Sequence, residues 1–452
     1  MKLFAWQWLA ASSLLLAAVV ASGETRPRYG GTLRIEMRAA LSSLDPADRN
    51  VPDSFGRRNV TALIFDTLVT FDDTAHIKPA LAESWQAAGQ ELRLHIRHDV
   101  KFHDGTSLTA ETVAASLRFA NPSWKVMAEP DSVTIQGDFS EEELLAQLTL
   151  SRNAIVKRDA GKVSGTGPFH IVDWQSGSRL TLAAEDNCWR GRPFLDSIAV
   201  EMGKSYHDQM TSLQLGRVDL IEVSPEQVRR ISQEGRGIAS SMPIELVALV
   251  FAREALSPEE QALRSALALS VDRTAIRDVL LQGAGEAAGS ILPIWMSGYG
   301  FVFSSGVDLS KARQLRGQAA TIPNWRLGYD TGDPLDRLLA ERIALNAHDA
   351  GLALQTTSSP SPDLWIAHLP LEGDAWNSLG KLADQMGVPL TKRHGSLEEL
   401  YAAEQAILKS GRIIPLLHLP ASYVASPGLR NWRVRSEGTV SLDDAWLESA
   451  RQ

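Results

Sequence analysis

A strand–helix–strand alternation in the last third of the chain constrains the fold more than any other feature. The stretches "WRLGYD" (325–330) and "LALQTT" (352–357) have the composition of strands. Between them, "GDPLDRLLAERIALNAHDAG" (332–351) predicts a helix that stops at its final glycine. Strands that alternate with helices of this length form partly parallel sheets. The sequence therefore predicts an α/β fold with some parallel pairing.

Size and composition limit the classes of function. The chain has 452 residues, enough for two or three domains, and is 44% hydrophobic and 22% charged, as ordinary globular proteins are. Acidic residues (54) outnumber basic ones (45), and no Lys/Arg-rich run stands out, which argues against nucleic acid as a partner. Cys188 is the single cysteine, so the chain cannot close an internal disulfide or supply a zinc–cysteine cage.

The first 23 residues have the pattern of a secretory signal peptide. Lys2 is followed by an apolar run over 9–20 and then by Ala21, Ser22 and Gly23. The run is shorter than the roughly 20 apolar residues that span a bilayer. No cysteine follows it, so lipid attachment at a mature N-terminal cysteine is not expected. We expect a cleaved signal peptide over 1–23 and an exported, periplasmic protein; an uncleaved anchor is the alternative.

The stretch "VKFHDGTSLTAETV" (100–113) sets His103 beside an aspartate, close to His95 and His98. Residues at these offsets along strands do not all point one way, and the spacing matches none of the usual zinc patterns. The same residues are also expected where an Asp-Gly turn is followed by a helix with Thr109 as its N-cap. We predict a corner between a strand and a helix, and no metal site.

Further segments carry clear local signals but no catalytic constellation. A hairpin is predicted around a turn at Ser176–Gly177, and a helix begins after Ser257 with Pro258 and Glu260 in its first turn. There is no nucleophile elbow, no metal-ligand spacing and no Ser-x-x-Lys set in a convincing context. We therefore expect no enzyme activity, no catalytic residue and no cofactor.

A series of motifs in a fixed order resembles one protein family, the extracellular solute-binding proteins of peptide-type ABC importers, called family 5. The most specific block is "KPALAESW" followed by "LRLHIRHDVKFHDGTSLTAETVAASL", within 78–117. The other motifs are "GGTLRI" (30–35), "SLDP" (43–46), "IFDTLVTFD" (64–72), "DSVTI" (131–135), "GTGPF" (165–169), "RPFLDSI" (192–198), "SLQLGRVDL" (212–220), "LRSALALSVDRTAI" (263–276) and "IIPLLHLPASYVA" (413–425). Together they cover nearly all of the chain after the signal peptide.

The resemblance implies a two-lobed, periplasmic binding protein type II-like α/β fold made of interleaved segments. The first lobe would comprise 28–57, 164–248 and 418–452, with a small subdomain inserted at 58–163, and the second lobe would comprise 249–417. It also implies a monomer that captures a small solute, a peptide or peptide-like molecule, in the cleft between lobes and delivers it to membrane permease subunits. A ligand sensor or chaperone-like binding module without transport is the alternative.

The sequence departs from the family pattern in the second lobe. Such proteins carry there a strand followed by an acidic residue that meets a peptide's N-terminal ammonium. In "PDLWIAHLPLEGDAWNSLG" (362–380) we interpret the acidic position as replaced by His368 or Leu369, with Glu372 and Asp374 displaced. The segment between 120 and 131 is also shorter than usual. A ligand other than a standard peptide is therefore an open alternative.

The candidate ligand-binding residues are aromatic and polar side chains, because a binding cleft needs apolar walls and a few oriented polar groups. The candidates are Ser42, Ser43, Trp295, Tyr299, Trp365, His368, Asp374 and Trp376. For each tryptophan the alternative is packing in the core, and for Asp374 it is a solvated loop. A carboxylate or histidine enclosed in a closed cleft would bind a cationic group of the ligand.

Overall fold

A computed structural model describes residues 26–72, 76–390 and 393–448, so the predicted signal peptide lies outside the described residues. Its centre is an 11-stranded sheet with the order β10-β11-β12-β1-β13-β19-β14-β18-β16-β17, and β15 pairs with β19. The strands are β1 (Thr32–Glu36), β10 (Phe169–Gln175), β11 (Arg179–Ala184), β12 (Ser197–Glu201), β13 (Leu220–Glu222), β14 (Ile238–Phe251), β15 (Glu286–Ala287), β16 (Asn324–Gly328), β17 (Ala353–Thr357), β18 (Leu364–Pro370) and β19 (Ile413–Ala425).

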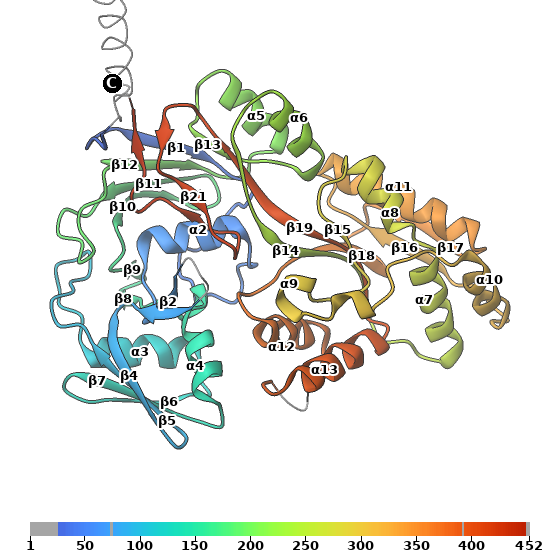
Figure 1. Ribbon diagram of the computed structural model, residues 1–452, viewed down its shortest axis with the longest axis horizontal. Coiled ribbons are helices and arrows are strands. Elements are labelled where there is room, and N and C mark those ends of the chain that lie inside the picture. The colour runs from blue at the N-terminus through green and yellow to red at the C-terminus, as the bar shows by residue number, and fades with distance from the viewer. Residues whose placement is uncertain (1–25, 73–75, 391–392, 449–452) are drawn as a thin grey trace, which may run out of the picture.

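The two longest strands, β14 and β19, join the two halves of the molecule. They are antiparallel to each other and run through the middle of the structure (Figure 1). At one end β19 pairs with β13, and at the other end β14 pairs with β18. We call the half with β1 and β10–β13 the first lobe and the half with β16–β18 the second lobe. The sheet therefore continues from one lobe into the other.

The first lobe combines parallel and antiparallel pairing. Strand β1 is parallel to both β12 and β13, while β10 and β11 form the predicted hairpin, whose turn places Gly177 at a φ of 72°. One apolar core includes Leu33, Phe169 and Ile198. Its helices are α2 (Phe55–Ile64), α5 (Tyr206–Gln214) and α6 (Val228–Gln233), and the short strands β20 (Leu429–Arg430), β21 (Arg433–Val434), β22 (Val440–Ser441) and β23 (Trp446–Leu447) follow β19.

A smaller body with its own apolar core projects from the first lobe, and we call it the inserted subdomain. It contains β4 (Ala82–Ala88), β5 (Glu91–Ile96), β6 (Lys125–Ala128), β7 (Ser132–Gln136), α3 (Ala110–Ala120) and α4 (Glu141–Leu148). The pairs β2 (Val69–Phe71) with β3 (Ile77–Pro79), and β8 (Lys157–Asp159) with β9 (Lys162–Ser164), flank it. The predicted corner is confirmed: Thr109 caps α3, and His103 Nε2 contacts the Gly167 carbonyl oxygen over 2.9 Å.

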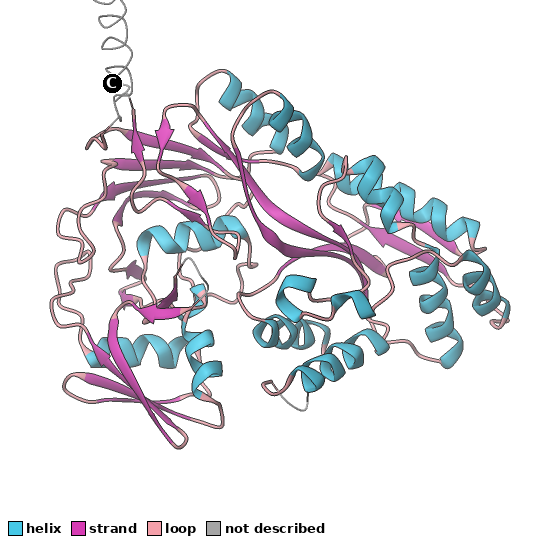
Figure 2. Cartoon of the chain, in the orientation of Figure 1, coloured by secondary structure: helices cyan, strands magenta, loops and turns pink. Residues whose placement is uncertain are grey.

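The second lobe has helices on both faces of its strands (Figure 2). They are α7 (Pro258–Ser270), α8 (Arg273–Ala275), α9 (Ile294–Ser297), α10 (Leu309–Gly317), α11 (Pro334–Asp349), α12 (Ala375–Met386) and α13 (Leu397–Lys409). The predicted strand–helix–strand unit is β16, α11 and β17, and its strands are parallel, with Asn324 opposite Ala353. The α/β class and the two-lobed fold are confirmed, whereas the residue boundaries of the lobes stay a prediction. Within the described residues, no helix is both long and apolar enough to cross a bilayer.

Candidate functional site

A cavity of about 560 Å³ lies between the lobes. Its wall is built from three parts of the chain: the segment that leads into α2, the end of α3 with α4 and the following turn, and the start of α12. The lining residues include Asp48, Arg49, Asp53, Arg57, Arg58, Thr61, Asn121, Glu143, Gln147, Arg152, Glu372, Trp376, Lys381, Asp384 and Arg393. The first lobe, the inserted subdomain and the second lobe therefore all face one space, which we call the interlobe cleft.

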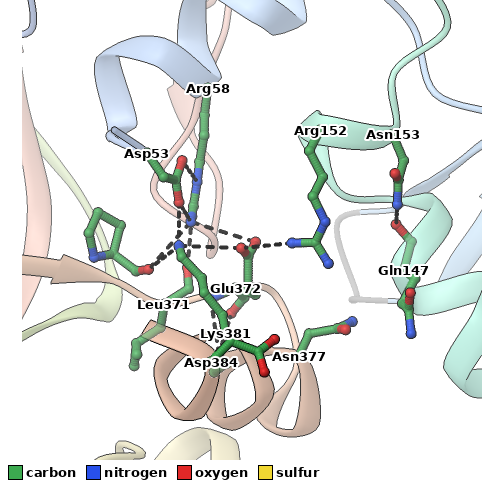
Figure 3. Close-up of polar contacts among 12 residues, drawn as sticks. Asp53, Arg58, Gln147, Arg152, Asn153, Leu371, Glu372, Asn377, Lys381 and Asp384 are labelled. Atoms are coloured by element: carbon green, nitrogen blue, oxygen red, sulfur yellow. Dashed lines mark hydrogen bonds and ion pairs between the residues drawn. The ribbon is translucent and has the colours of Figure 1, made fainter. Parts of the chain in front are cut away.

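Glu372 is the central charged residue of the interlobe cleft (Figure 3). It lies two residues after β18 and is only 7% exposed. Its carboxylate oxygens are 3.3 Å from an Arg152 nitrogen, 3.3 Å from Lys381 Nζ and 3.6 Å from an Arg58 nitrogen. Three cations from three parts of the structure thus converge on one buried carboxylate.

The start of α2 places Asp53 and Arg58 in the interlobe cleft. Ser54 is the N-cap and accepts from the backbone N–H of Arg57, which fixes the first turn of the helix. Arg58 then donates to both carboxylate oxygens of Asp53, over 3.0 and 2.5 Å. Its remaining nitrogen donates to the Leu371 carbonyl oxygen over 2.7 Å. The first lobe is therefore tied to the end of β18 in the second lobe.

The start of α12 brings Lys381 to the same place. Asp374 caps this helix and accepts from the backbone N–H of Asn377 over 3.0 Å. Lys381 lies about two turns further along the helix, donates to the Pro370 carbonyl oxygen over 2.9 Å and forms an ion pair with Asp53. Local capping therefore aims the lysine at the opposite lobe.

Arg152 reaches the cleft from the inserted subdomain. It lies in a 3₁₀ turn, η1 (Ser151–Asn153), next to the fully buried Asn153. The Asn153 side chain donates to the Gln147 carbonyl oxygen over 2.7 Å and accepts from the Asn121 side chain over 2.8 Å. These bonds hold the turn, while the Arg152 side chain remains 41% exposed.

Burial and neighbouring charges shift the pKa of Asp53 in the interlobe cleft in opposite directions. Burial by itself would raise the pKa of Asp53, but the charges of Arg58 and Lys381 outweigh it and lower that pKa well below the ordinary value. Burial likewise raises the pKa of Glu143, which lines the cleft from the first turn of α4. Asp53 therefore remains ionised over the physiological pH range.

A second cavity of about 430 Å³ lies on the other side of Arg58 and Glu372. Trp189, Arg190 and Arg435 contribute to its wall. Arg58 and Glu372 line both cavities, as do Thr61, Leu150 and Ser151, so this buried ion pair is part of the partition between them.

A separate contact joins the lobes at the carboxyl ends of their parallel strands. Arg38 follows β1 and lies 3.0 Å from Asp333 and 3.2 Å from Asp330, which follows β16. Its guanidinium also lies over the Tyr206 ring, 4.6 Å from the centroid. In α/β sheets, ligands bind in the crevice outside these strand ends. Arg38 therefore crosses the place where the fold positions a ligand.

The structure leaves open a role in ligand binding for five of the predicted site residues: Ser42, Ser43, Trp295, Trp365 and Trp376. Trp376 is among the residues that line the interlobe cleft, whereas Ser43 lines a separate, shallow cavity. The Ser42 carbonyl accepts from Ser176 over 3.2 Å. Trp295 and Trp365 are both 37% exposed, and the Trp295 indole donates to the Pro243 carbonyl oxygen over 2.7 Å. Their contact with a ligand stays a prediction.

The other three predicted residues have structural partners. Tyr299 is buried and packs edge-on against Tyr401. Asp374 is the cap of α12 described above. His368 lies between Asp336, at 2.9 Å, and Glu245, at 3.4 Å. Burial would lower the pKa of His368, but the two carboxylates outweigh it and raise the pKa well above the ordinary value. His368 is therefore a cation paired inside the second lobe.

Glu372 lines the interlobe cleft, although sequence analysis set it aside as displaced. The interpretation that His368 or Leu369 replaces the family's acidic residue stays a prediction. The chain turns directly after β18, and the Ser378 hydroxyl accepts from the Glu372 backbone N–H over 2.9 Å, so the side chain faces the cleft. Sequence analysis also missed Asp53, Arg58, Arg152 and Lys381. The charged pattern "PDSFGRR" (52–58) at the start of α2 was a usable signal, because a capped helix start aims its first-turn side chains predictably.

The chain has the fold of two-lobed periplasmic binding proteins, with a cavity between the lobes. Comparison with known families then identifies the particular family: residues 76–377 match the bacterial extracellular solute-binding proteins, family 5 Middle. The match covers more than half of the chain, and the chain belongs to this family. Members are solute-binding components of ABC importers and bind varied ligands, so a binding protein fits better than an enzyme at the level of the family.

Individual relatives are distant. The chain is 25% identical to the nickel-binding protein NikA of Staphylococcus aureus, a match over 62% of this chain and 59% of NikA. It is 26% identical to heme-binding protein A of Haemophilus influenzae, over 73% and 70%. The chain thus spans about three fifths to seven tenths of these relatives. The structure of the oligopeptide-binding protein AppA of Bacillus subtilis with a nonapeptide has a TM-score of 0.78 at 16% identity, covering 93% of this chain and 100% of that one, which shows the shared fold.

Proposed function

We propose that this chain is the periplasmic solute-binding component of a peptide-type ABC importer. It captures a small solute, a peptide or peptide-like molecule, in the interlobe cleft and delivers it to permease subunits in the membrane. The observation that carries the proposal is the cavity of about 560 Å³ whose wall combines both lobes and the inserted subdomain. A ligand that touches separately packed bodies fixes their relative position, so binding and lobe closure are coupled.

Family membership supports the class of function but not a single ligand. The relatives described above are named for nickel and for heme, and one structure holds a nonapeptide. The side chains of this cleft must therefore select the solute. Trp376 supplies the aromatic surface, and the charged groups around Glu372 supply orientation.

The long strands β14 and β19 can act as the hinge when the lobes close on a ligand. They are the elements of the sheet that pass between lobes, so small changes along them move one lobe against the other. Between the lobes, Arg58 donates to the Leu371 carbonyl oxygen and Arg38 forms an ion pair with Asp333. Expulsion of water from the cleft strengthens each charged contact with the ligand.

Ligand binding by the purified protein tests the proposal. Di- and tripeptides are screened by thermal shift, followed by calorimetry of the best one. A ligand at a thousandfold excess over its dissociation constant stabilises the folded state by about 4 kcal/mol. Trp376→Ala should weaken binding at least about tenfold, the effect of losing about 1.4 kcal/mol of stacking and burial. Phe301→Ala, which removes an exposed aromatic side chain of the same lobe outside the cleft lining, is the matched control.

Two outcomes would contradict the proposal at different levels. If no peptide raises the melting temperature, the peptide assignment fails while the family assignment remains. Uptake of a labelled ligand by cells that lack this chain tests transport itself. Binding in solution combined with normal uptake in those cells would favour a sensor or chaperone-like role.

A further inference from the structure

Part of the wall of the interlobe cleft is a loop without helix or strand, at positions 45–51 between β1 and α2. We call it the wall loop. The inserted subdomain supplies another part of the wall, from the end of α3 and from α4. The separation of these two parts therefore limits the room that a solute has in the cleft.

A single guanidinium holds the wall loop in shape. Arg57, in the first turn of α2, donates to four of its carbonyl oxygens: those of Val51 (2.5 Å), Asp48 (2.8 Å), Asp45 (3.0 Å) and Pro46 (3.2 Å). A segment outside helices and strands has to satisfy its backbone groups in another way, and a guanidinium offers five N–H donors in one plane. The wall loop is therefore one unit, and a contact that holds Asp45 also holds the part of the loop that lines the cleft.

An ion pair outside the cleft lining ties the wall loop to the inserted subdomain. Arg158, in β8, donates through Nε and Nη2 to the two carboxylate oxygens of Asp45, over 2.7 Å each. The same guanidinium lies 4.0 Å from the ring centroid of Phe119 in α3. All three residues line the separate, shallow cavity, and the Asp45 and Arg158 side chains are only 16% and 22% exposed. A two-point bond combined with stacking fixes direction as well as distance.

The point of attachment on α3 leads directly into the cleft. Phe119 is followed by Ala120 and Asn121, which line the cleft. The Ala120 carbonyl oxygen also accepts from Arg49 of the wall loop, over 3.4 Å. This distance lies beyond the usual range for an N–H···O hydrogen bond. The pair of Asp45 with Arg158 is therefore the stronger of these two ties between the wall loop and α3.

We propose that Asp45 and Arg158 are positioning residues of the interlobe cleft. Their ion pair holds the wall loop against the end of α3, and so it sets the width of the cleft between these two parts of its wall. The pair acts on a solute without contacting it, by limiting the size of the molecule that fits. The effect on solute size rests on the proposed function, whereas the effect on cleft width does not.

Spin-label distances test the positioning without any solute. Asn50→Cys in the wall loop and Gln86→Cys in β4, both at exposed positions, carry the labels. A Cys188→Ala background leaves no other thiol in the chain. Double electron–electron resonance should show a broader distance distribution when Arg158→Gln is added, because the wall loop then moves relative to the subdomain.

Further variants separate the ion pair from a general loss of structure. Asp45→Asn removes the charge of the other partner and should broaden the distribution in the same way. Arg158→Lys retains the charge and should broaden it less. Arg93→Gln, which breaks an exposed ion pair with Glu129 within the inserted subdomain, is the control and should leave the distribution unchanged. Thermal unfolding verifies that each variant is folded.

Peptide affinities test the consequence for solute size. Calorimetry compares dialanine with tetraalanine. Arg158→Gln should change the ratio of their two dissociation constants at least about threefold, because the fit in a preformed site depends on placement within about 0.5 Å. A loss of stability alone would weaken the binding of both peptides equally.

The outcomes separate failure of this inference from failure of the proposed function. An unchanged distance distribution in Arg158→Gln, or equal broadening in Arg93→Gln, overturns the inference and leaves the proposed function intact. An unchanged ratio of affinities beside a broadened distribution overturns the role in size selection. If the distribution broadens as expected but neither peptide binds, the peptide assignment of the proposed function fails while the positioning of the wall loop stands.

Discussion

The guanidinium of Arg58 donates to the carbonyl oxygen of Leu371 over 2.7 Å, although 313 positions separate the two residues. This bond joins the first turn of α2 in the first lobe to the end of β18 in the second lobe. The same side chain pairs with Asp53 and faces Glu372, so one buried cation holds both walls of the cleft (Figure 3).

Replacement of this cation should be costly. Arg58→Met leaves the carboxylates of Asp53 and Glu372 with one partner fewer in a buried site. We expect the free energy of unfolding to fall by about 3 kcal/mol or more, the range for breaking a buried ion pair. Urea denaturation followed by circular dichroism measures it. Arg430→Met, which breaks a pair with the half-exposed Glu448, is the control and should cost less than about 1 kcal/mol. Equal losses in the two variants would contradict a special role for Arg58.

His368 should make stability depend on pH. Its folded-state pKa is raised well above 6.5, so the protonated ring stabilises the folded state fully below about pH 6.5. That contribution is lost as the pH rises through the raised folded-state value. The difference in unfolding free energy between the native chain and His368→Gln should therefore be largest below pH 6.5 and shrink at alkaline pH. Urea titrations at several pH values measure this difference, and a gap that stays constant would rule out the pairing with Glu245 and Asp336.

The two glycines of "GTGPF" (165–169) pack against the end of α2, where a side chain has no room. A Cβ atom at Gly165 would lie 1.9 Å from the Ile64 carbonyl oxygen at the end of α2. Gly165→Ala should therefore destabilise the fold by about 1–3 kcal/mol, as overpacking does. A Cβ at Gly237 would meet nothing within 4 Å, so Gly237→Ala is the control and should be neutral or slightly stabilising. Thermal unfolding of the two variants compares them; similar melting temperatures would contradict the close approach.

Glu404 should matter as a hydrogen-bond acceptor. This buried carboxylate accepts from the backbone N–H groups of Ile291 (2.5 Å) and Leu292 (3.0 Å), and burial raises its pKa. Glu404→Leu leaves both N–H groups without this acceptor and should cost about 2–4 kcal/mol of unfolding free energy. Glu404→Gln retains an acceptor oxygen and should cost less than about 1 kcal/mol. Denaturant titration measures both, and a leucine variant as stable as the glutamine variant would exclude this role.

The elements that sequence analysis predicted correctly depend on neighbours in the chain. Thr109 caps α3 and Ser257 caps α7, because a cap bonds a backbone N–H only three residues away. The turn at Gly177 and the parallel pair β16 and β17 follow from equally local patterns. Most predicted ligand residues were chosen by residue type alone, and type did not separate Trp376 in the cleft from Tyr299 in a core.

The letters of the chain by themselves determined the α/β class, the start of many helices and the resemblance to a family of binding proteins, because these features are carried by short-range patterns. Only the tertiary structure decided which charges meet. Arg152 and Glu372 are 220 residues apart, and Asp53 and Lys381 are 328 apart. Their pairing depends on how two lobes and a subdomain pack around a shared sheet, since electrostatic contacts act through space and leave no periodicity in the chain.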